Sequence, residues 1–333
     1  MKFKKVLVTG GAGCIGIEVC KNLERRGIPT HLLDVTEQVA RTKHALPKSV
    51  RIFYGSILDT STIREAIEGC DAVIHLAAML GVKRTEVNKL RCLEINIEGT
   101  KNVIDCCIQH RVKKIVFASS SEVYGEPFEN PVNEKTPTQG KTVYAVSKLA
   151  AEELCKGYAQ RYPLDYTILR YFNTYGQYQT AQFVLPKFIL NALNGRPPII
   201  YGDGDQLRSF CYASDTADGT VRALLSDKAS GEVFNIGNSQ QKMSLKELAN
   251  LVLEVTHKDK RITPVFKKGF IGADRVATRE INIRFCNISK AKEILGYEPK
   301  VDLVTGIKKL SEPGVIFEKW ETTELPYLQE ENS

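Results

Sequence analysis

The sequence contains no uninterrupted apolar run as long as the ~18 residues that a membrane-spanning helix requires. Its first residues enter a strand pattern at once, so we expect neither a membrane span nor a signal peptide. Basic runs are also absent, because the 46 lysines and arginines are dispersed among 39 acidic residues. A nucleic-acid groove needs a basic stripe, so no nucleic-acid partner is expected. The net charge of +7 weakly favours an anionic small substrate.

The cysteines lack any arrangement that would bind a metal or form a disulfide framework. There are nine, an odd number, and no two stand in a C-x-x-C pair. No histidine stands at metal-ligand spacing from them. We therefore expect reduced thiols, a cytoplasmic protein and no metal site. With 333 residues, 43% of them apolar, the chain can form one domain with its own core and an additional lobe.

A glycine-rich stretch near the start of the sequence predicts a dinucleotide site. It follows the apolar run 5–9, which is typical of a buried parallel strand, and it precedes a helical pattern. The glycines would give a tight turn, close approach of the backbone to a pyrophosphate, and close contact between helix and strand. The helix N-terminus would offer free N–H groups to the phosphates. The alternative is a glycine turn that binds no ligand. The residues predicted to line the site are Gly10, Gly13, Cys14, Ile15 and Gly16.

A second strand, 31–33, ends in Asp34, about twenty residues after the glycines. A carboxylate at this place accepts hydrogen bonds from both hydroxyls of an adenosine ribose and repels a 2′-phosphate. We therefore expect NAD rather than NADP, although Arg41 lies within reach in the sequence.

Two more strands are expected to bring cofactor-binding residues to the same edge. Strand 51–54 leads to Ser56 and Ile57, in a loop that would meet the adenine. Strand 71–78 contains His75, which we expect to be a hydrogen-bonded core histidine. At the exit of this strand stand Leu76, Ala77 and Ala78, which are the cofactor-binding candidates here.

Residues 79–96 form a longer connecting segment that carries Lys83, Arg84 and Arg91. Charges in such a loop are usually solvated. The alternative is contact with an anionic group of a substrate.

Polar residues from 119 to 148 predict a catalytic site. Residues 119–122 follow an apolar run, as they would at the exit of a buried strand. Tyr144 and Lys148 fall in a helical pattern, and their i, i+4 spacing puts both on one face. A lysine charge beside a tyrosine favours phenolate, so the tyrosine can exchange protons near neutral pH. The alternative is an ordinary exposed helix face. The catalytic candidates are Ser120, Ser121, Glu122, Tyr144 and Lys148.

The alternation of strands and helices predicts an α/β fold with a doubly wound parallel (Rossmann) sheet. Ligands of such sheets lie at the carboxyl ends of the strands, where the candidates above are expected. We expect the NAD-binding domain to span 1–176, with 208–238 returning to it. A smaller mixed α/β C-terminal lobe would comprise 177–207 and 239–320, and 321–333 would form a loose tail.

Together, these motifs resemble those of the extended short-chain dehydrogenase/reductase family, and within it the nucleotide-sugar epimerase/dehydratase branch, over about residues 5 to 310. The resemblance implies that a sugar 4-hydroxyl is oxidised transiently by NAD in a reaction that is redox-neutral overall. It implies that Tyr144 takes the hydroxyl proton and that Ser120 hydrogen-bonds the same hydroxyl. Lys148 would hold the nicotinamide ribose and lower the pKa of the tyrosine.

The resemblance also implies a nucleotide-sugar substrate, with a UDP-linked sugar favoured, and a substrate-binding role for the lobe. It assigns Asn173 to the diphosphate and sugar, Tyr201 to the nucleobase, Arg208 to the diphosphate, and Arg284 to the nucleotide or sugar. A homodimer is a further implication. In it, the helices predicted at about 97–110 and 143–161 pair across a two-fold axis.

Position 122 bears most directly on the reaction. Epimerases of the family commonly have a small or neutral residue there, whereas many 4,6-dehydratases and UDP-glucuronate decarboxylases have glutamate. We predict a UDP- or other NDP-hexose dehydratase, in which Glu122 removes the C5 proton and the 6-hydroxyl is lost. The alternatives are an NDP-sugar 4-epimerase and a UDP-glucuronate decarboxylase, although residues 80–84 lack the proline-and-tyrosine loop of decarboxylases. From other classes, a simple alcohol dehydrogenase and a non-catalytic NAD-binding sensor or scaffold also stay open.

Overall fold

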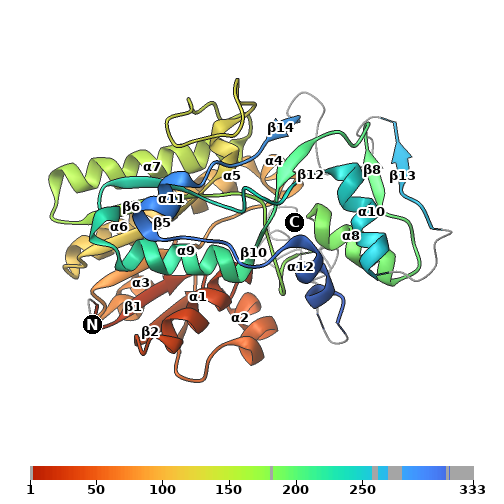
Figure 1. Ribbon diagram of the computed structural model, residues 1–333. Coiled ribbons are helices and arrows are strands. Elements are labelled where there is room, and N and C mark those ends of the chain that lie inside the picture. Colours follow the sequence, from red (N-terminus) through yellow and green to blue (C-terminus); the bar gives the residue numbers. More distant parts are fainter. Residues whose placement is uncertain (1–2, 181–182, 257–261, 269–279, 313–314, 316–333) are drawn as a thin grey trace, which may run out of the picture.

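The computed structural model describes residues 3–180, 183–256, 262–268, 280–312 and 315. Its centre is a parallel sheet of seven strands in the order β11-β6-β5-β4-β1-β2-β3 (Figure 1). The inner strands are short apolar runs that are buried on both faces, as expected where helices cover both sides of a parallel sheet. The strand bounds are β1 Val6–Thr9, β2 Thr30–Asp34, β3 Arg51–Tyr54, β4 Ala72–His75, β5 Lys114–Ser120, β6 Asp165–Tyr171 and β11 Glu232–Ile236.

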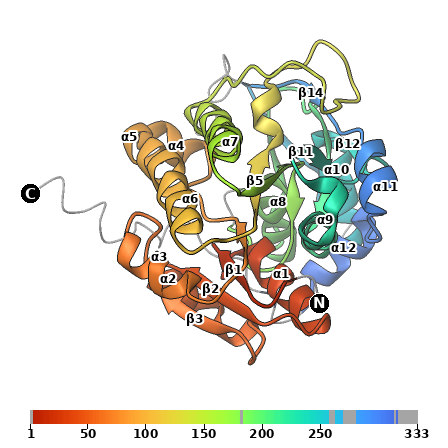
Figure 2. The same ribbon diagram turned by 90° about the vertical axis from the view of Figure 1, so that its left-hand side faces the viewer.

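Helices pack against the two faces of the sheet and form a separate core on each (Figure 2). One face carries α1 (Cys14–Arg25), α9 (Ala213–Leu225) and α11 (Ser289–Leu295). The other carries α3 (Thr60–Ile67), α6 (Gly99–Gln109) and α7 (Val143–Arg161). The doubly wound α/β fold predicted from the sequence is therefore confirmed. Near the edge, α2 (Thr36–Thr42) follows β2.

A third core belongs to a smaller mixed α/β lobe. Its helices are α8 (Val184–Leu193), α10 (Leu245–Thr256) and α12 (Leu303–Leu310). Its strands are β8 (Ile199–Tyr201), β9 (Leu207–Ser209), β12 (Lys242–Ser244), β13 (Val265–Lys267) and β14 (Ile283–Arg284). Between the lobe and the sheet domain run the paired strands β7 (Thr174–Tyr175) and β10 (Cys211–Tyr212).

The chain crosses between lobe and sheet domain more than once. After the first visit to the lobe it returns to form α9 and β11, the outermost strand of the sheet. It returns again at α11, whose Ala291 and Leu295 belong to the core that α1 and α9 share. Our expectation had placed residues 239–320 wholly in the lobe. Nothing in the local pattern of residues 289–295 indicates which core they join.

The strand order reverses between β1 and β4, which are neighbours although β2 and β3 lie on the far side of β1. The crevice at the carboxyl ends of the strands next to such a reversal is where open α/β sheets bind ligands. The glycine turn, the residues after β4 and the serines at the end of β5 all lie at this edge. Within the described residues, no helix is both long enough and apolar enough to span a membrane.

Candidate active site

The glycine turn between β1 and α1 is built by close packing. Gly10 has φ +68°, and a Cβ there would lie 2.6 Å from the backbone nitrogen of Ala77. A Cβ on Gly16 would lie 2.4 Å from the carbonyl oxygen of Gly10. Gly13 is different, because the nearest atom to a Cβ there would be 3.4 Å away. Two glycines therefore let the backbone fold on itself, and the third leaves the N-terminus of α1 open to a phosphate.

Asp34 ends β2 beside this turn. Its two carboxylate oxygens accept hydrogen bonds from the backbone N–H groups of Ala12, at 3.0 Å, and Val35, at 2.8 Å. The carbonyl oxygen of Ala12 is held in turn by Gln38 and Thr42. The carboxylate is thus fixed next to the glycine turn, at the place where the ribose of a bound dinucleotide would lie.

Replacing Asp34 by alanine should abolish the expected preference of this site for NAD over NADP. The carboxylate would otherwise face the added 2′-phosphate at close range, and two negative charges repel strongly in a partly buried site. Titration of the wild type and the variant with both cofactors measures the preference. Equal affinity of the wild type for NAD and NADP would contradict the assignment of Asp34.

The other predicted cofactor residues surround the turn. Ala77 lies against Gly10, as the glycine geometry requires, and it follows Leu76 directly. Ile57 is buried against Gly99 at the start of α6. Ser56 accepts a hydrogen bond from the backbone N–H of the second residue after it. Ala78 follows in the same segment after β4.

His75 behaves as expected of a core histidine. Its Nδ1 lies 2.6 Å from the Thr9 hydroxyl and its Nε2 lies 3.0 Å from the Thr100 hydroxyl. Burial lowers its pKa to about 3, with a further contribution from the charge of Lys148. The imidazole is therefore neutral and serves to join β1, β4 and α6.

Tyr144 and Lys148 stand one turn apart at the start of α7, where Thr142 caps the helix by accepting a hydrogen bond from Ala145 at 3.1 Å. Lys148 is buried, and its Nζ donates to the carbonyl oxygen of Ala118 on β5 at 2.8 Å. The same atom lies 5.9 Å from the centre of the Tyr144 ring. Burial lowers the pKa of Lys148 to about 8. The ammonium therefore loses its proton far more readily than a solvated lysine does.

With protein side chains alone, Tyr144 does not have the lowered pKa that we expected beside this lysine. Burial raises the pKa of Tyr144 well above its ordinary value, the negative charge of Glu122 raises it further, and a hydrogen bond with Ser120 opposes the rise. Burial and a like charge outweigh the influence expected from the lysine. Formation of the phenolate would therefore need an additional positive charge near Tyr144, such as one that a bound cofactor carries.

Glu122 forms a partly buried ion pair that links the two parts of the molecule. It lies on the short 3-10 helix η3 (Ser121–Tyr124), whose N-cap is Ser120. Its Oε1 accepts a hydrogen bond from Nη2 of Arg284, on β14 of the lobe, at 2.6 Å. The Arg284 side chain is 1% exposed. Its other two nitrogens, Nε and Nη1, are buried and have no partner among the described residues.

Arg208 is the register partner of Arg284 in the parallel pair of β9 and β14. It is buried and pairs with Glu280 at 3.1 Å, and it also donates to the carbonyl oxygens of Ile281 and Asn282. The two predicted arginines thus stand on adjacent strands, and Arg208 fixes the chain that leads to Arg284.

The remaining predicted site residues lie on several different elements. Asn173 follows β6 with φ +31°, and its amide donates to the Ser209 carbonyl at 2.8 Å. Tyr201 ends β8 in the lobe. Arg84 lies on α4 (Val82–Val87), which packs against α7, and Ser121 is buried on η3. The side chain of Lys83 lies outside what the structure describes.

Sequence reasoning missed Asn96, which lies in a π-helical turn (Glu94–Glu98) that leads into α6. Its amide donates to the Met79 carbonyl at 3.0 Å and to the Ser147 hydroxyl at 2.9 Å, and its oxygen accepts from the Met79 N–H at 2.8 Å. It therefore joins the segment after β4 to α7, where Ser147 directly precedes Lys148. An asparagine within a helical pattern, where it is intrinsically unfavourable, was the available signal.

The chain is similar over most of its length to several known proteins. A family described as the NAD dependent epimerase/dehydratase family matches residues 6–237. A UDP-N-acetyl-alpha-D-glucosaminuronate decarboxylase of Bacillus cytotoxicus is 36% identical over 320 residues, 92% of this chain and 96% of the relative. A dTDP-D-glucose 4,6-dehydratase of Mus musculus is 32% identical, over 93% of this chain and 88% of the relative.

Among solved structures, a UDP-glucuronic acid 4-epimerase from Bacillus cereus, in complex with UDP-glucuronic acid and NAD, superposes with a TM-score of 0.80. It is 30% identical and the match covers 91% of this chain and 96% of that one. The chain belongs to the NAD-dependent epimerase/dehydratase family. It is an NAD-dependent enzyme of the kind that modifies nucleotide sugars, and the glycine turn and Asp34 fit that cofactor.

Proposed function

We propose that this enzyme removes the carboxylate of a UDP-linked hexuronate by transient oxidation at C4. The observation that carries the proposal is the buried guanidinium of Arg284, which pairs with Glu122 through one nitrogen and has two buried nitrogens without partners among the described residues. Buried donors without acceptors are costly. A second carboxylate, supplied by the substrate, would satisfy them.

The position of the ion pair relative to Tyr144 supports a role at C5 of the sugar. Glu122 lies close enough for its charge to raise the pKa of the tyrosine. If Tyr144 contacts the 4-hydroxyl, the neighbouring Glu122–Arg284 pair faces the adjacent carbon and its substituent. A hexose would bring a neutral hydroxymethyl group to that place and leave the arginine unsatisfied. A hexuronate would bring an anion.

Each side chain then has a defined task. Ser120 and Tyr144 hold the 4-hydroxyl, and Tyr144 accepts its proton when bound NAD supplies the acceptor and later the donor of the C4 hydride. The ketone at C4 makes the C5 carboxylate that of a β-keto acid, which loses CO₂ and leaves an enolate. The enolate takes a proton at C5 before C4 is reduced again. Lys148 places a positive charge near the tyrosine, and Arg284 orients the carboxylate of the substrate.

The dehydratase predicted from the sequence requires Glu122 to act as a base at C5. To remove the C5 proton, its carboxylate would have to give up the 2.6 Å bond to Arg284 and leave a buried guanidinium with no partner. Decarboxylation needs no base at C5, because the departing CO₂ leaves its electrons there. The dehydratase stays a prediction, and the ion pair favours the decarboxylase. A 4-epimerase acting on a hexuronate is the second candidate, supported by the solved relative with UDP-glucuronic acid.

The test is incubation of the purified enzyme and NAD with UDP-glucuronate, its N-acetylated counterpart and UDP-glucose. We expect a uronate to release CO₂ and give a UDP-linked pentose with deuterium at C5 in deuterated water. A hexuronate inverted at C4 and still carrying its carboxylate would identify an epimerase. Loss of water from UDP-glucose would identify a dehydratase. Replacing Arg284 by methionine should abolish CO₂ release, whereas the same change at the exposed Arg25 should not.

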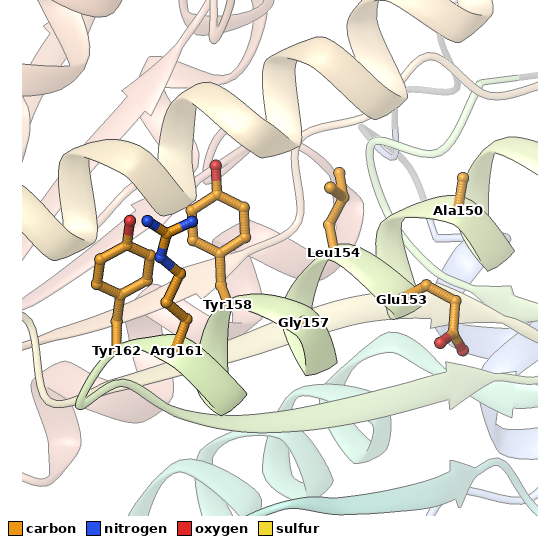
Figure 3. A pocket seen from close by; sticks show the side chains of 7 residues that line it. All are labelled: Ala150, Glu153, Leu154, Gly157, Tyr158, Arg161 and Tyr162. Carbon is orange, nitrogen blue, oxygen red and sulfur yellow. The ribbon is translucent and has the colours of Figure 1, made fainter.

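We also propose that the enzyme is a homodimer that pairs through α6 and α7. The outward face of α7 forms a surface hollow of about 450 Å³ (Figure 3), lined by Ala150, Glu153, Leu154, Gly157, Tyr158, Arg161 and Tyr162. Val146, on the same helix, is 49% exposed, and Tyr158 bonds Asp105 of α6. The apolar and aromatic side chains that α7 presents at this hollow suit pairing with a second copy.

Gly157 provides a sharp test of the dimer, because nothing lies within 4 Å of a Cβ built on it. Replacement by arginine should therefore be tolerated in a single copy but should clash with a partner. We expect light scattering to give twice the chain mass for the wild type and one chain mass for the arginine variant. Gly157→Ala is the control and should remain dimeric. A wild type that is monomeric at micromolar concentration would contradict the proposal.

A further inference from the structure

The loop that follows η3 runs along β14 and is joined to it by hydrogen bonds. The side chain of Asn130 accepts from the Phe285 N–H and donates to the Ile283 carbonyl, both at 3.2 Å. The backbone of Val132 donates to the Phe285 carbonyl and accepts from the Asn287 N–H, both at 2.8 Å. The sheet domain therefore holds the segment that carries Arg284 by hydrogen bonds to residues before and after the arginine.

Glu126 makes the contacts of this loop that come before Arg284 in the sequence. Its carboxylate accepts from the N–H of Asn282 at 2.7 Å and from the N–H of Ile283 at 3.1 Å. These are the two residues directly before the arginine. Glu122, four residues earlier than Glu126, holds the arginine side chain itself. One short segment thus fixes both the backbone and the guanidinium.

We propose that Glu126 is a positioning residue that sets the reach of Arg284 toward Glu122 and toward the carboxylate of the substrate. This inference rests on the proposed hexuronate specificity. A carboxylate with two charge-assisted bonds to consecutive N–H groups locates a strand far better than a single neutral bond does. The nearby Lys141 adds little to this role, because its Nζ is 4.0 Å away and half-exposed.

Glutamine cannot take over this role, although it has almost the same shape. Its side chain offers one oxygen and an NH₂ group, so one of the two backbone N–H groups would face a donor. The strand would have to shift to relieve that contact, and Arg284 would move with it. Glu129, three residues later on the same loop, is exposed and is the matched control.

The experiment measures binding of UDP-glucuronate and UDP-glucose to the NAD-loaded enzyme by calorimetry. We expect Glu126→Gln to weaken binding of UDP-glucuronate by roughly tenfold and to leave binding of UDP-glucose unchanged. Glu129→Gln should change neither. In an Arg284→Met background, Glu126→Gln should have no further effect on the preference, because the residue acts through the arginine.

The possible failures are distinct. If the wild type binds both sugars equally, the proposed hexuronate specificity is wrong and the role of Glu126 is wrong with it. If the wild type prefers UDP-glucuronate but Glu126→Gln retains that preference, only the positioning role is overturned. If the variant loses affinity for both sugars alike, Glu126 is a structural residue and the inference is again overturned.

Discussion

Replacement of Tyr144 by phenylalanine should lower kcat by about 10²–10⁴-fold, the usual cost of losing an acid–base group. Binding of NAD and of the nucleotide sugar should change little, because the ring and its packing remain. The variant loses only the hydroxyl group, whose pKa is affected by a hydrogen bond with Ser120 and by the charge of Glu122. Steady-state kinetics combined with calorimetric titration separates the two effects.

The control is Tyr166→Phe, which should leave kcat unchanged. Tyr166 lies at the start of β6, whereas the site lies at the carboxyl ends of the strands. Lys148→Ala supplies a second measurement. It should move the pH–rate profile upward, because the charge that assists the phenolate is gone. Retention of wild-type kcat by Tyr144→Phe would show that another group takes the proton. Stoichiometric accumulation of NADH with product would contradict a redox-neutral reaction.

Replacement of Arg170 by methionine should destabilise the protein by about 3–5 kcal/mol, as expected when one partner of a buried ion pair is removed. Arg170 lies on β6 and bonds Glu152 of α7 through two nitrogens, at 3.0 and 2.7 Å. The two side chains are 6% and 1% exposed. Glu152 would be left buried without its bidentate partner, although it would keep the hydrogen bond from the Ser119 hydroxyl, at 2.5 Å. The free energy of unfolding from urea titration measures the loss.

Two further variants make this result interpretable. The double variant Arg170→Met with Glu152→Leu should recover part of the lost stability, because neither member of the pair is left as a charge without the other. Lys21→Met breaks a half-exposed pair with Glu18 on α1 and should cost no more than about 0.5 kcal/mol. If Arg170→Met cost as little as Lys21→Met, the buried pair would not be holding α7 against the sheet.

The cofactor half of the site could be predicted from the sequence because its signals are local. Each strand leads directly into its functional residue, so the glycine turn and Asp34 follow from a few consecutive residues. The i, i+4 spacing of Tyr144 and Lys148 depends only on helix geometry. The opposite holds for the pKa of Tyr144, which burial and Glu122 raise together. Neither influence is visible before the chain is folded.

The substrate half depends on contacts between distant parts of the chain. Glu122 and Arg284 are 162 residues apart, and Arg284 lies on a strand of two residues that no periodicity marks. The sequence therefore suggested that Glu122 acts as a free base, and the partner that restrains it appears only in three dimensions. The same applies to Arg170 and Glu152, whose separate helix and strand patterns predict no pairing.

The Glu122–Arg284 pair also constrains how an enzyme of this kind can evolve. A mutation that neutralises Glu122 leaves Arg284, which is 1% exposed, as a buried charge without its carboxylate. The variant that loses Glu122 first is therefore less stable than the starting pair. A lineage that exchanges one nucleotide sugar for another would have to replace Arg284 first, replace both residues together, or first acquire stability elsewhere. Loss of Glu122 should accordingly be accompanied or preceded by loss of Arg284.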